Sequence, residues 1–320
     1  MVDKDLFLHD LAVVAILKNE APYLKEWLDY HLPAGVDHFY LYDNDSTDNQ
    51  AEVAKPYVEA GLVDYFSAPG KIMQMPVYND AVKRFKFHCR YMAFIDLDEF
   101  IFPKKNQSIV EVVDEILSRD KQAAALGINW QLFGSNGEEK ADYSRGVLER
   151  FTRHAPKNWV IQFKGNNFPV GNAHIKTIAN PRRIFFIYNP HCARYFESFQ
   201  PVNENGKIIS GNIPNAFNFP VTAEKIVVNH YYTKSREEFL EKMRRGRCDQ
   251  KRNDYSMRFF EIFNRNEVFD DGILKYRIAR AENFSLESYD EKIQRVTTAL
   301  IEILSRYASG EVFDLETALT

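Results

Sequence analysis

The feature that most constrains the fold is a series of short apolar segments that alternate with helical patterns in the N-terminal third of the chain. Residues 11–17 (LAVVAIL) are continuously apolar, which is typical of a strand that is covered on both faces. Shorter strand-like segments follow at 38–42, 62–66 and 92–95. Because these strands alternate with helices, we predict an α/β domain with a mostly parallel sheet between two layers of helices.

Capping signals and apolar periodicity indicate the helices between these strands. Asn19 is expected to cap the first helix, with Pro22 in its first turn. A second helix follows an acidic turn at 43–48, and residues 74–90 are expected to form a third, with Cys89 on its apolar stripe. Each predicted helix therefore connects one strand to the next.

The remainder of the chain is less regular. Between residues 120 and 230, β-like segments alternate with turn-rich stretches, which indicates a mixed sheet with long loops. Helical patterns return after Ser235, which begins the capping box Ser235-x-x-Glu238. We therefore predict a main domain over residues 1–250 and a helical C-terminal extension, 251–320, packed on it.

Composition narrows the class of protein. With 41 basic and 45 acidic side chains, the formal net charge is −4, so no overall basic field attracts nucleic acid. The three cysteines form no C-x-x-C pair, which argues against structural zinc and favours a reducing compartment. The sequence has neither a signal peptide nor an apolar run of about 18 residues. We expect a cytoplasmic protein, with peripheral contact at the inner face of a membrane left open.

An acidic cluster follows the fourth predicted strand, in the segment FIDLDE (94–99). Ligands of open α/β sheets bind outside the carboxyl ends of the strands. If the chain is extended there, Asp96 and Asp98 point to the same side. A divalent cation such as Mg²⁺ or Mn²⁺ would then remove their repulsion and bind phosphate oxygens as well. The alternative is an acidic turn that holds no metal.

Longer motifs surround this cluster. The N-terminal part contains VAILKNEAPYLKEWLDYHLPAGVDHFYLYDNDSTDN, which begins at Val14, and FIDLDEFIFP (94–103). Further along lie NWQLFGSNG (129–137), KTIANPRRIFFIYNPHCARY (176–195) and NHYYTKSREEFLEKMRRGRCD (229–249). In these motifs the sequence resembles glycosyltransferases of family 92 and related bacterial glycosyl transferase family 2-like proteins, over about residues 11–250.

The resemblance implies a GT-A fold, a Rossmann-like three-layer α/β/α arrangement in which residues 1–250 are the catalytic domain. It also implies a nucleotide-sugar donor, a divalent metal, usually Mn²⁺, and inversion at the anomeric carbon. Position by position, it implies these roles: Asp96 and Asp98 at the metal and diphosphate, Asn19 and Glu20 at the donor, Asp45 near the uridine, and His230 as a third metal ligand. The alternative for His230 is a half-buried histidine that bonds to the backbone at the end of a strand.

An inverting transfer also needs a general base for the acceptor hydroxyl, usually a carboxylate. Glu149 lies in suitable chain order after the acidic cluster, and Asp142 and Glu138 are rivals. Glu149 alternatively forms an ion pair with a nearby arginine. Lys83, on the helix before the acidic cluster, either reaches the donor or belongs to a surface helix face.

A basic run ends the helix that follows the capping box, and it includes Lys242, Arg244, Arg245 and Arg247. These side chains form a solvated face aligned with the helix dipole, or contact the donor diphosphate or a phosphorylated or lipid-linked acceptor. Arg247 is our candidate for the donor diphosphate. Trp130 either stacks on an acceptor sugar or packs in the core.

Together these features predict a metal-dependent hexosyltransferase that uses a nucleotide sugar, with a UDP-sugar as the expected donor. Its acceptor would be a glycan or glycolipid in the synthesis of a surface or capsular polysaccharide. A nucleotidyltransferase is the first alternative, but it would normally have a glycine-rich phosphate loop where this chain has LKNEAPYL. The second alternative is a non-catalytic module that binds a sugar or nucleotide, which would have no need of Asp96 and Asp98.

Overall fold

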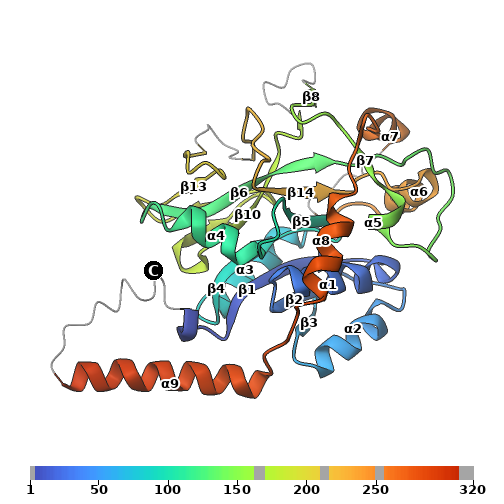
Figure 1. The fold of residues 1–320 in the computed structure, drawn as a ribbon. Coiled ribbons are helices and arrows are strands. Elements are labelled where there is room, and N and C mark those ends of the chain that lie inside the picture. The colour runs from blue at the N-terminus through green and yellow to red at the C-terminus, as the bar shows by residue number, and fades with distance from the viewer. Residues whose placement is uncertain (1–3, 162–169, 210–215, 249–255, 310–320) are drawn as a thin grey trace.

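The chain is built around one large mixed sheet (Figure 1). In the computed structural model, residues 4–161, 170–209, 216–248 and 256–309 are described. Within these ranges the sheet has nine strands. Eight of them follow one another in the order β3 (Val63–Ser67), β2 (His38–Asp43), β1 (His9–Leu17), β4 (Cys89–Phe94), β10 (Ile175–Ala179), β6 (Ala123–Leu132), β14 (Ile226–His230) and β5 (Glu99–Pro103). The ninth, β13 (Gln200–Val202), pairs with β6.

The sheet is mostly parallel, as predicted. Strands β1 to β4 all run in one direction, and β6 is parallel to both β13 and β14. Antiparallel pairs join β10 to β4 and to β6, and join β5 to β14. In register, Leu17 of β1 lies beside Asp43 of β2, and Val14 lies beside Phe94 of β4. The turns after these three strands therefore meet at one edge of the sheet.

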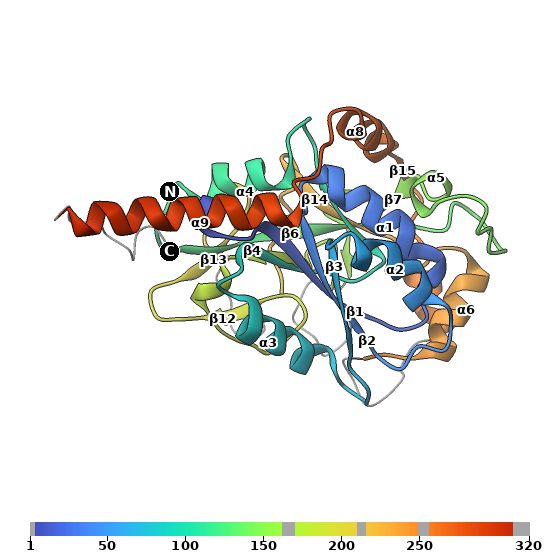
Figure 2. The ribbon, with the colours of Figure 1, turned by 90° about the horizontal axis from the view of Figure 1, so that it is seen from below.

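Helices cover both faces of the sheet, and the alternation of β1 decides which residues face which layer. Its odd-numbered residues from Leu11 to Leu17 pack in one core cluster with α1 (Ala21–Ala34), α4 (Ile109–Leu117) and α8 (Gly272–Ala281). Its even-numbered residues from Ala12 to Ile16 pack in a second cluster with α3 (Gln74–Phe85). Figure 2 shows α1, α4 and α8 on one side of the strands and α3 on the other. The predicted three-layer α/β/α arrangement is confirmed.

The remaining elements surround this sandwich. Three two-stranded sheets are formed by β11 (Ile184–Ile187) with β12 (Ala193–Tyr195), β8 (Val160–Ile161) with β9 (Val170–Gly171), and β15 (Val268–Phe269) with β7 (Arg153–His154). The other helices are α2 (Gln50–Glu59), α5 (Val147–Arg150), α6 (Arg236–Arg245), α7 (Met257–Phe263) and α9 (Tyr289–Ala308), with 3₁₀ turns at Lys4–Leu6 and Pro181–Arg183.

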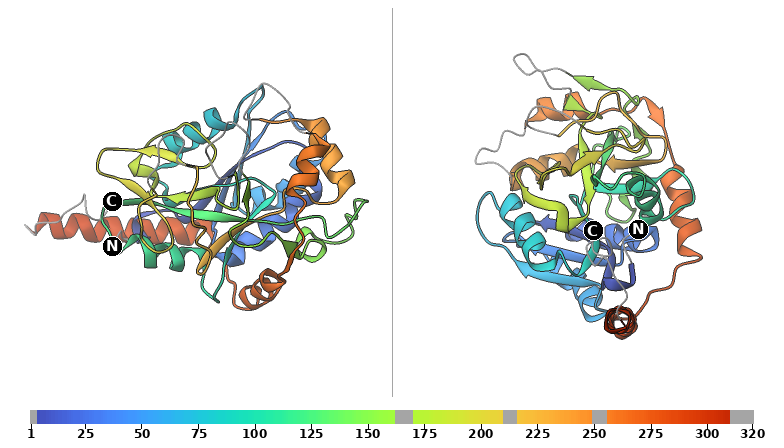
Figure 3. Two further views of the ribbon diagram at one scale, coloured as in Figure 1. Left: turned by 90° about the horizontal axis from the view of Figure 1, so that it is seen from above. Right: turned by 90° about the vertical axis from the view of Figure 1, so that its left-hand side faces the viewer.

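The C-terminal region is helical, as predicted. Its helix α9 runs beside the N-terminus (Figure 3), where Leu6 and Phe7 pack against Ala299 and Ile303. Helix α8 contributes Ile273 and Tyr276 to the main core, so this helix packs against the sheet domain. The division at residue 250 stays a prediction. Among the described helices, none is long and apolar enough to cross a membrane.

Two local predictions were wrong. Asn19 does not cap α1, because Glu20 occupies the N-cap position and Oδ1 of Asn19 accepts from the Thr47 amide at 2.7 Å. The carboxylate of Asp48 accepts from the first amide of the helix, Ala21, at 2.9 Å instead. Cys89 is not on a helix, because α3 ends at Phe85 and Cys89 begins β4. The capping box of Ser235 and Glu238 is confirmed.

Candidate active site

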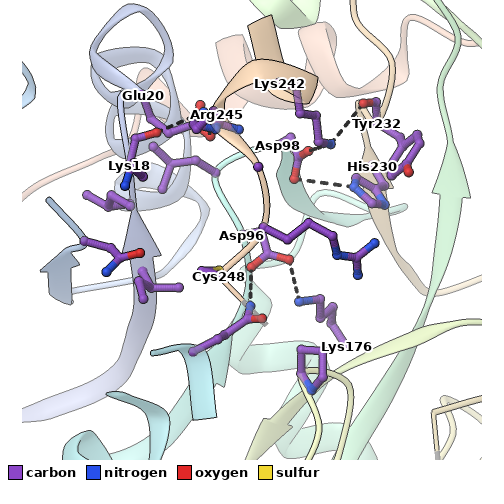
Figure 4. A pocket seen from close by; sticks show the side chains of 18 of the residues that line it. Lys18, Glu20, Asp96, Asp98, Lys176, His230, Tyr232, Lys242, Arg245 and Cys248 are labelled. Carbon is purple, nitrogen blue, oxygen red and sulfur yellow. Dashed lines mark hydrogen bonds and ion pairs between the residues drawn. The ribbon is translucent and has the colours of Figure 1, made fainter. Parts of the chain in front are cut away.

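The acidic segment after β4 forms a turn, so the extended chain on which the comparison of Asp96 and Asp98 depended is not present. The amide of Glu99 donates to the carbonyl of Asp96 at 3.1 Å. The amide of Asp96 in turn donates to Oε2 of Glu99 at 3.0 Å. This reciprocal pair closes the turn and fixes Asp98 at its outer corner. Although the chain is not extended, Asp96 and Asp98 both line the same pocket (Figure 4).

Asp96 is held by side chains from two other elements. Lys176 of β10 donates to Oδ2 at 2.9 Å, and Gln74 of α3 donates to Oδ1 at 2.9 Å. Lys176 is only 1% exposed and also lies 3.3 Å from Oε2 of Glu99. Burial alone would lower the pKa of Lys176, but Asp96 and Glu99 raise it well above its usual value. The pocket therefore has a permanently charged lysine in its floor.

Asp98 lies between a lysine and a histidine. Lys242 of α6 donates to Oδ2 at 2.7 Å, and Nε2 of His230, at the end of β14, lies 3.4 Å from Oδ1. Burial would raise the pKa of Asp98, but Lys242 and His230 hold it well below its usual value. Asp98 is thus ionised at neutral pH. Its Oδ2 is bonded to Lys242, and its Oδ1 lies beside His230.

His230 is buried and has one ring nitrogen without a hydrogen-bond partner. Burial lowers the pKa of His230, although Asp98 opposes that effect, so the imidazole is neutral at neutral pH. Its Nδ1 has no partner in the described part of the chain, and neither has Oε1 of Glu99. These two atoms lie 4.0 Å apart, because Glu99 and His230 are opposite each other in the β5–β14 pair. The ring of Trp130 packs on the imidazole, with centroids 4.3 Å apart.

The pocket around these groups has a volume of about 400 Å³ and lies at the carboxyl ends of β1, β2 and β4. Lys18 and Glu20 line it after β1, and Asn44 lines it after β2. Arg245 of α6 closes one side by an ion pair with Glu20 at 2.5 Å and a bond to the Lys18 carbonyl at 3.0 Å. We refer to this cavity as the inner pocket.

The residues present fit a divalent cation that shares its coordination with a substrate. Oδ1 of Asp98 and the neutral Nε2 of His230 lie side by side and are chemically suited to Mn²⁺. In the ranges that the structure describes, no group of three or more His, Cys, Asp or Glu side chains could hold a metal. The protein would thus supply two ligands, and diphosphate and water the rest, which is a common arrangement for Mg²⁺ and related cations.

Most of the predicted donor residues lie in or beside the inner pocket. Asp96, Asp98, Glu20, His230 and Arg247 line it. Their roles at the donor or the metal stay predictions.

Three further candidates lie outside the inner pocket. The exposed Asp45 accepts from the amide of Gly70, which does line the pocket, at 2.9 Å. Asn19 holds the turn at 43–48 instead of facing the cavity. Lys83 is exposed on α3 and does not line it.

The three candidate general bases do not line the inner pocket. Glu149 is exposed and forms an ion pair with Arg277 at 3.1 Å, in line with the alternative for this residue. Glu138 pairs with Arg150 at 3.0 Å, and Asp142 accepts from the hydroxyl of Ser144 at 2.6 Å. Their catalytic roles stay predictions.

Several residues of the inner pocket were not singled out from the sequence. Lys176 interrupts an apolar strand, IKTIA, and a buried lysine in such a strand requires a nearby carboxylate. That signal could have identified Lys176 as a partner of the acidic cluster. Gln74 and Asn44 carry no comparable signal, since their polar side chains are ordinary at the start of a helix and in a turn.

Comparison with known proteins assigns the class. The sequence profile described as glycosyltransferase family 92 matches residues 13–256. A family 92 protein of Ricinus communis is 26% identical over 145 residues, which are 45% of this chain and 26% of that protein. A galactan β-1,4-galactosyltransferase of Arabidopsis thaliana is 32% identical over 100 residues, covering 28% of this chain and 19% of that protein. The chain thus spans about a quarter or less of the length of these relatives.

Among solved structures, the chain is similar to Staphylococcus aureus TarS 1-349 in complex with UDP-GlcNAc. The TM-score is 0.41 at 14% identity, over 94% of this chain and 73% of that one. The family profile and the curated relatives are of glycosyltransferases, which favours this class over the nucleotidyltransferase and the non-catalytic module. More particularly, because the profile covers well over half of the chain, the protein belongs to glycosyltransferase family 92.

Proposed function

We propose that the protein transfers a hexosyl group, with inversion, from a UDP-sugar bound in the inner pocket to a saccharide or lipid-linked saccharide. The observation that carries this proposal is the convergence of Asp96, Asp98 and His230 with several cations at the carboxyl edge of the sheet. That edge is where nucleotides bind in open α/β folds. The galactosyltransferases among the relatives make UDP-galactose the first donor to test.

The charge of the inner pocket suits a diphosphate. Lys18, Lys71, Lys176, Lys242, Arg245 and Arg247 line it, against the carboxylates Glu20, Asp96 and Asp98. Three of the cations are engaged with those carboxylates, namely Lys176, Lys242 and Arg245. The lining still has an excess of positive charge, so an incoming diphosphate would replace water with charge-assisted hydrogen bonds.

The metal would be held by Oδ1 of Asp98 and Nε2 of His230, with Asp96 beside them. A divalent cation bound there would neutralise the negative charge that develops on the leaving diphosphate. Lys242 keeps Asp98 ionised and directs its free oxygen toward the imidazole. Lys176 and Gln74 hold Asp96 so that its carboxylate stays at the floor of the pocket.

In the proposed transfer, the acceptor oxygen forms a bond to the anomeric carbon from the face opposite the diphosphate. The bond from that carbon to the diphosphate oxygen breaks, and its electron pair leaves with UDP. The hydroxyl proton passes to a carboxylate or to water. Trp130, at the end of the pocket near His230, is placed to contact the sugar being transferred.

The test is a turnover assay that measures UDP release from UDP-galactose and other UDP-hexoses, with Mn²⁺ or with EDTA and with galactan oligosaccharides as acceptors. We expect turnover that needs Mn²⁺ and falls at least 100-fold in Asp98→Asn. Asp120→Asn is the control, because Asp120 is exposed and, among the described residues, its carboxylate bonds only the Gln122 amide. Equal turnover by wild type and Asp98→Asn would refute the assignment of the site.

A further inference from the structure

A second cavity of about 400 Å³ adjoins the inner pocket and shares Lys242 and Arg245 with it. We refer to it as the outer pocket. Its lining includes Tyr23 of α1, Tyr143 of the loop before α5, Lys234 just before α6 and Glu241 on α6. Because Arg245 reaches across to Glu20 and Lys18, it forms part of the wall between the two cavities.

Lys234 is the unusual residue of the outer pocket. Its residue exposure is 5%, and its φ of 49° is one that few residues other than glycine adopt. Its ammonium lies 4.4 Å from the centroid of the Tyr23 ring. Among the described residues, it has no hydrogen bond or ion pair. Burial lowers the pKa of Lys234, although Asp98 and Glu20 oppose that effect. A buried ammonium of this kind calls for an anionic partner.

The carboxylates of the outer pocket are already used by other groups. Glu238 accepts from Arg150 at 3.0 and 2.5 Å and from the Tyr23 hydroxyl at 2.9 Å. Glu241 accepts from the Tyr143 hydroxyl at 2.9 Å. Arg244, which is exposed, adds a further positive charge to the lining. The pocket therefore offers Lys234 and Arg244 to a negatively charged ligand.

The aromatic lining indicates what else the ligand contains. The rings of Tyr23 and Tyr143 meet edge to face, with centroids 6.1 Å apart, and Tyr143 is half exposed. Tyrosines of this kind present an apolar face and a hydroxyl, which suits a pyranose ring. A volume of about 400 Å³ is large enough for one or two sugar units.

We propose that the outer pocket is an acceptor subsite for an anionic saccharide, whose carboxylate or phosphate binds Lys234 and Arg244 and whose ring packs against Tyr143. This inference rests on the proposed function, because it places the acceptor next to the donor across Lys242 and Arg245. A sugar carboxylate and a sugar phosphate share the chemistry that the pocket recognises, so they are separate arms of the test.

The experiment titrates galactose, galacturonate and galactose 6-phosphate onto the full chain, with and without saturating UDP and Mg²⁺, and measures binding by saturation-transfer NMR. We expect one or both anionic sugars to bind at least 10-fold more tightly than galactose when UDP fills the inner pocket. The stronger of the two identifies the acceptor as a uronate or a phosphosugar.

Lys234→Met keeps the aliphatic stem over Tyr23 and removes the charge, so it should abolish the preference for the anionic sugar and leave UDP affinity unchanged. Arg244→Gln, at an exposed position, should reduce the same preference about threefold without any risk to folding. Lys121→Met, on an exposed turn, is the control.

Equal binding of galactose and the two anionic sugars by wild type would overturn the proposal. So would an undiminished preference in both Lys234→Met and Arg244→Gln. If UDP fails to bind but the anionic sugars still depend on Lys234, the proposed donor is wrong and the outer pocket stands.

Discussion

The ion pair between Arg150 and Glu238 connects the end of α5 to α6, the helix that carries Lys242 and Arg245 into the site. Both side chains are 1% exposed, and the guanidinium contacts the carboxylate through two parallel bonds of 3.0 and 2.5 Å. Removing Arg150 leaves a buried carboxylate whose remaining donors are the Tyr23 hydroxyl and the Ser235 amide. The variant Arg150→Met keeps most of the volume and removes this pair together with the contact between Arg150 and Glu138.

Breaking a buried pair from one side costs about 3–5 kcal/mol, because one charge stays buried without its partner. At an unfolding entropy of about 2 cal/mol/K per residue, this chain of 320 residues would melt about 4–8 °C lower. Urea unfolding followed by circular dichroism measures the free energy, and a thermal scan gives the melting temperature.

Two further variants separate this pair from general effects of charge. Arg145→Met removes an exposed arginine that lies 3.9 Å from Glu138, and should change stability by less than about 0.5 kcal/mol. The double variant Arg150→Met/Glu238→Gln should regain part of the loss, because the neutral amide is less costly to bury. A loss below about 1 kcal/mol in Arg150→Met would refute this reasoning.

Two other predictions concern buried polar groups. Burial lowers the pKa of His31 to about 3, although the hydrogen bond to the Trp27 carbonyl opposes this shift. The unfolded chain therefore binds a proton at His31 more readily than the folded one. Above the usual histidine pKa this residue costs no stability, and below it the free energy of unfolding falls by up to about 1.4 kcal/mol per pH unit. Urea unfolding between pH 4.5 and 7.5 should show a smaller slope in His31→Gln. Glu99→Gln should weaken Mn²⁺ binding to the UDP complex about 10- to 100-fold, because the Glu99 carboxylate accepts from the Asp96 amide and pairs with Lys176, and so holds the turn that carries Asp98. Isothermal titration calorimetry measures this affinity for Mn²⁺.

Each of these has a matched comparison. For His31, equal pH slopes in wild type and variant would contradict the prediction. For Glu99, the control is Glu204→Gln, which alters a buried carboxylate that accepts the amides of residues 224–226 at the opposite end of β14. If Glu99→Gln binds Mn²⁺ as tightly as wild type does, the Glu99 carboxylate has no part in holding the metal-binding turn.

The first four strands could be predicted because each is a short apolar run, and local sequence is sufficient to identify such runs. The partners of the later strands could not. Strand β10 lies between β4 and β6 and runs against both, although about 80 residues of chain separate it from β4 and about 40 from β6. The pairing of strands depends on the packing of the whole sheet, and hydrophobic periodicity along the sequence does not identify the partners.

The acidic cluster could be located from the sequence, but the groups that hold it could not. Asp96 and Asp98 stand out as carboxylates at the end of a buried strand, whereas Lys176 and Lys242 come from 80 and 144 residues further along the chain. Asn19 was misread for the same reason. Its local sequence suits a helix cap, but the Oδ1 atom bonds a turn that only the tertiary fold brings close.

The central claim is that the inner pocket binds a nucleoside diphosphate together with a divalent cation through Asp98. The most direct measurement is a thermal-shift series with UDP, GDP, CDP and ADP, each with and without Mn²⁺, on wild type and Asp98→Asn. A nucleotide at 100 times its Kd stabilises the fold by about 2.7 kcal/mol. The account predicts that UDP with Mn²⁺ stabilises wild type by this amount and stabilises Asp98→Asn far less. If no nucleotide shifts the melting temperature of wild type in either condition, the claim is wrong.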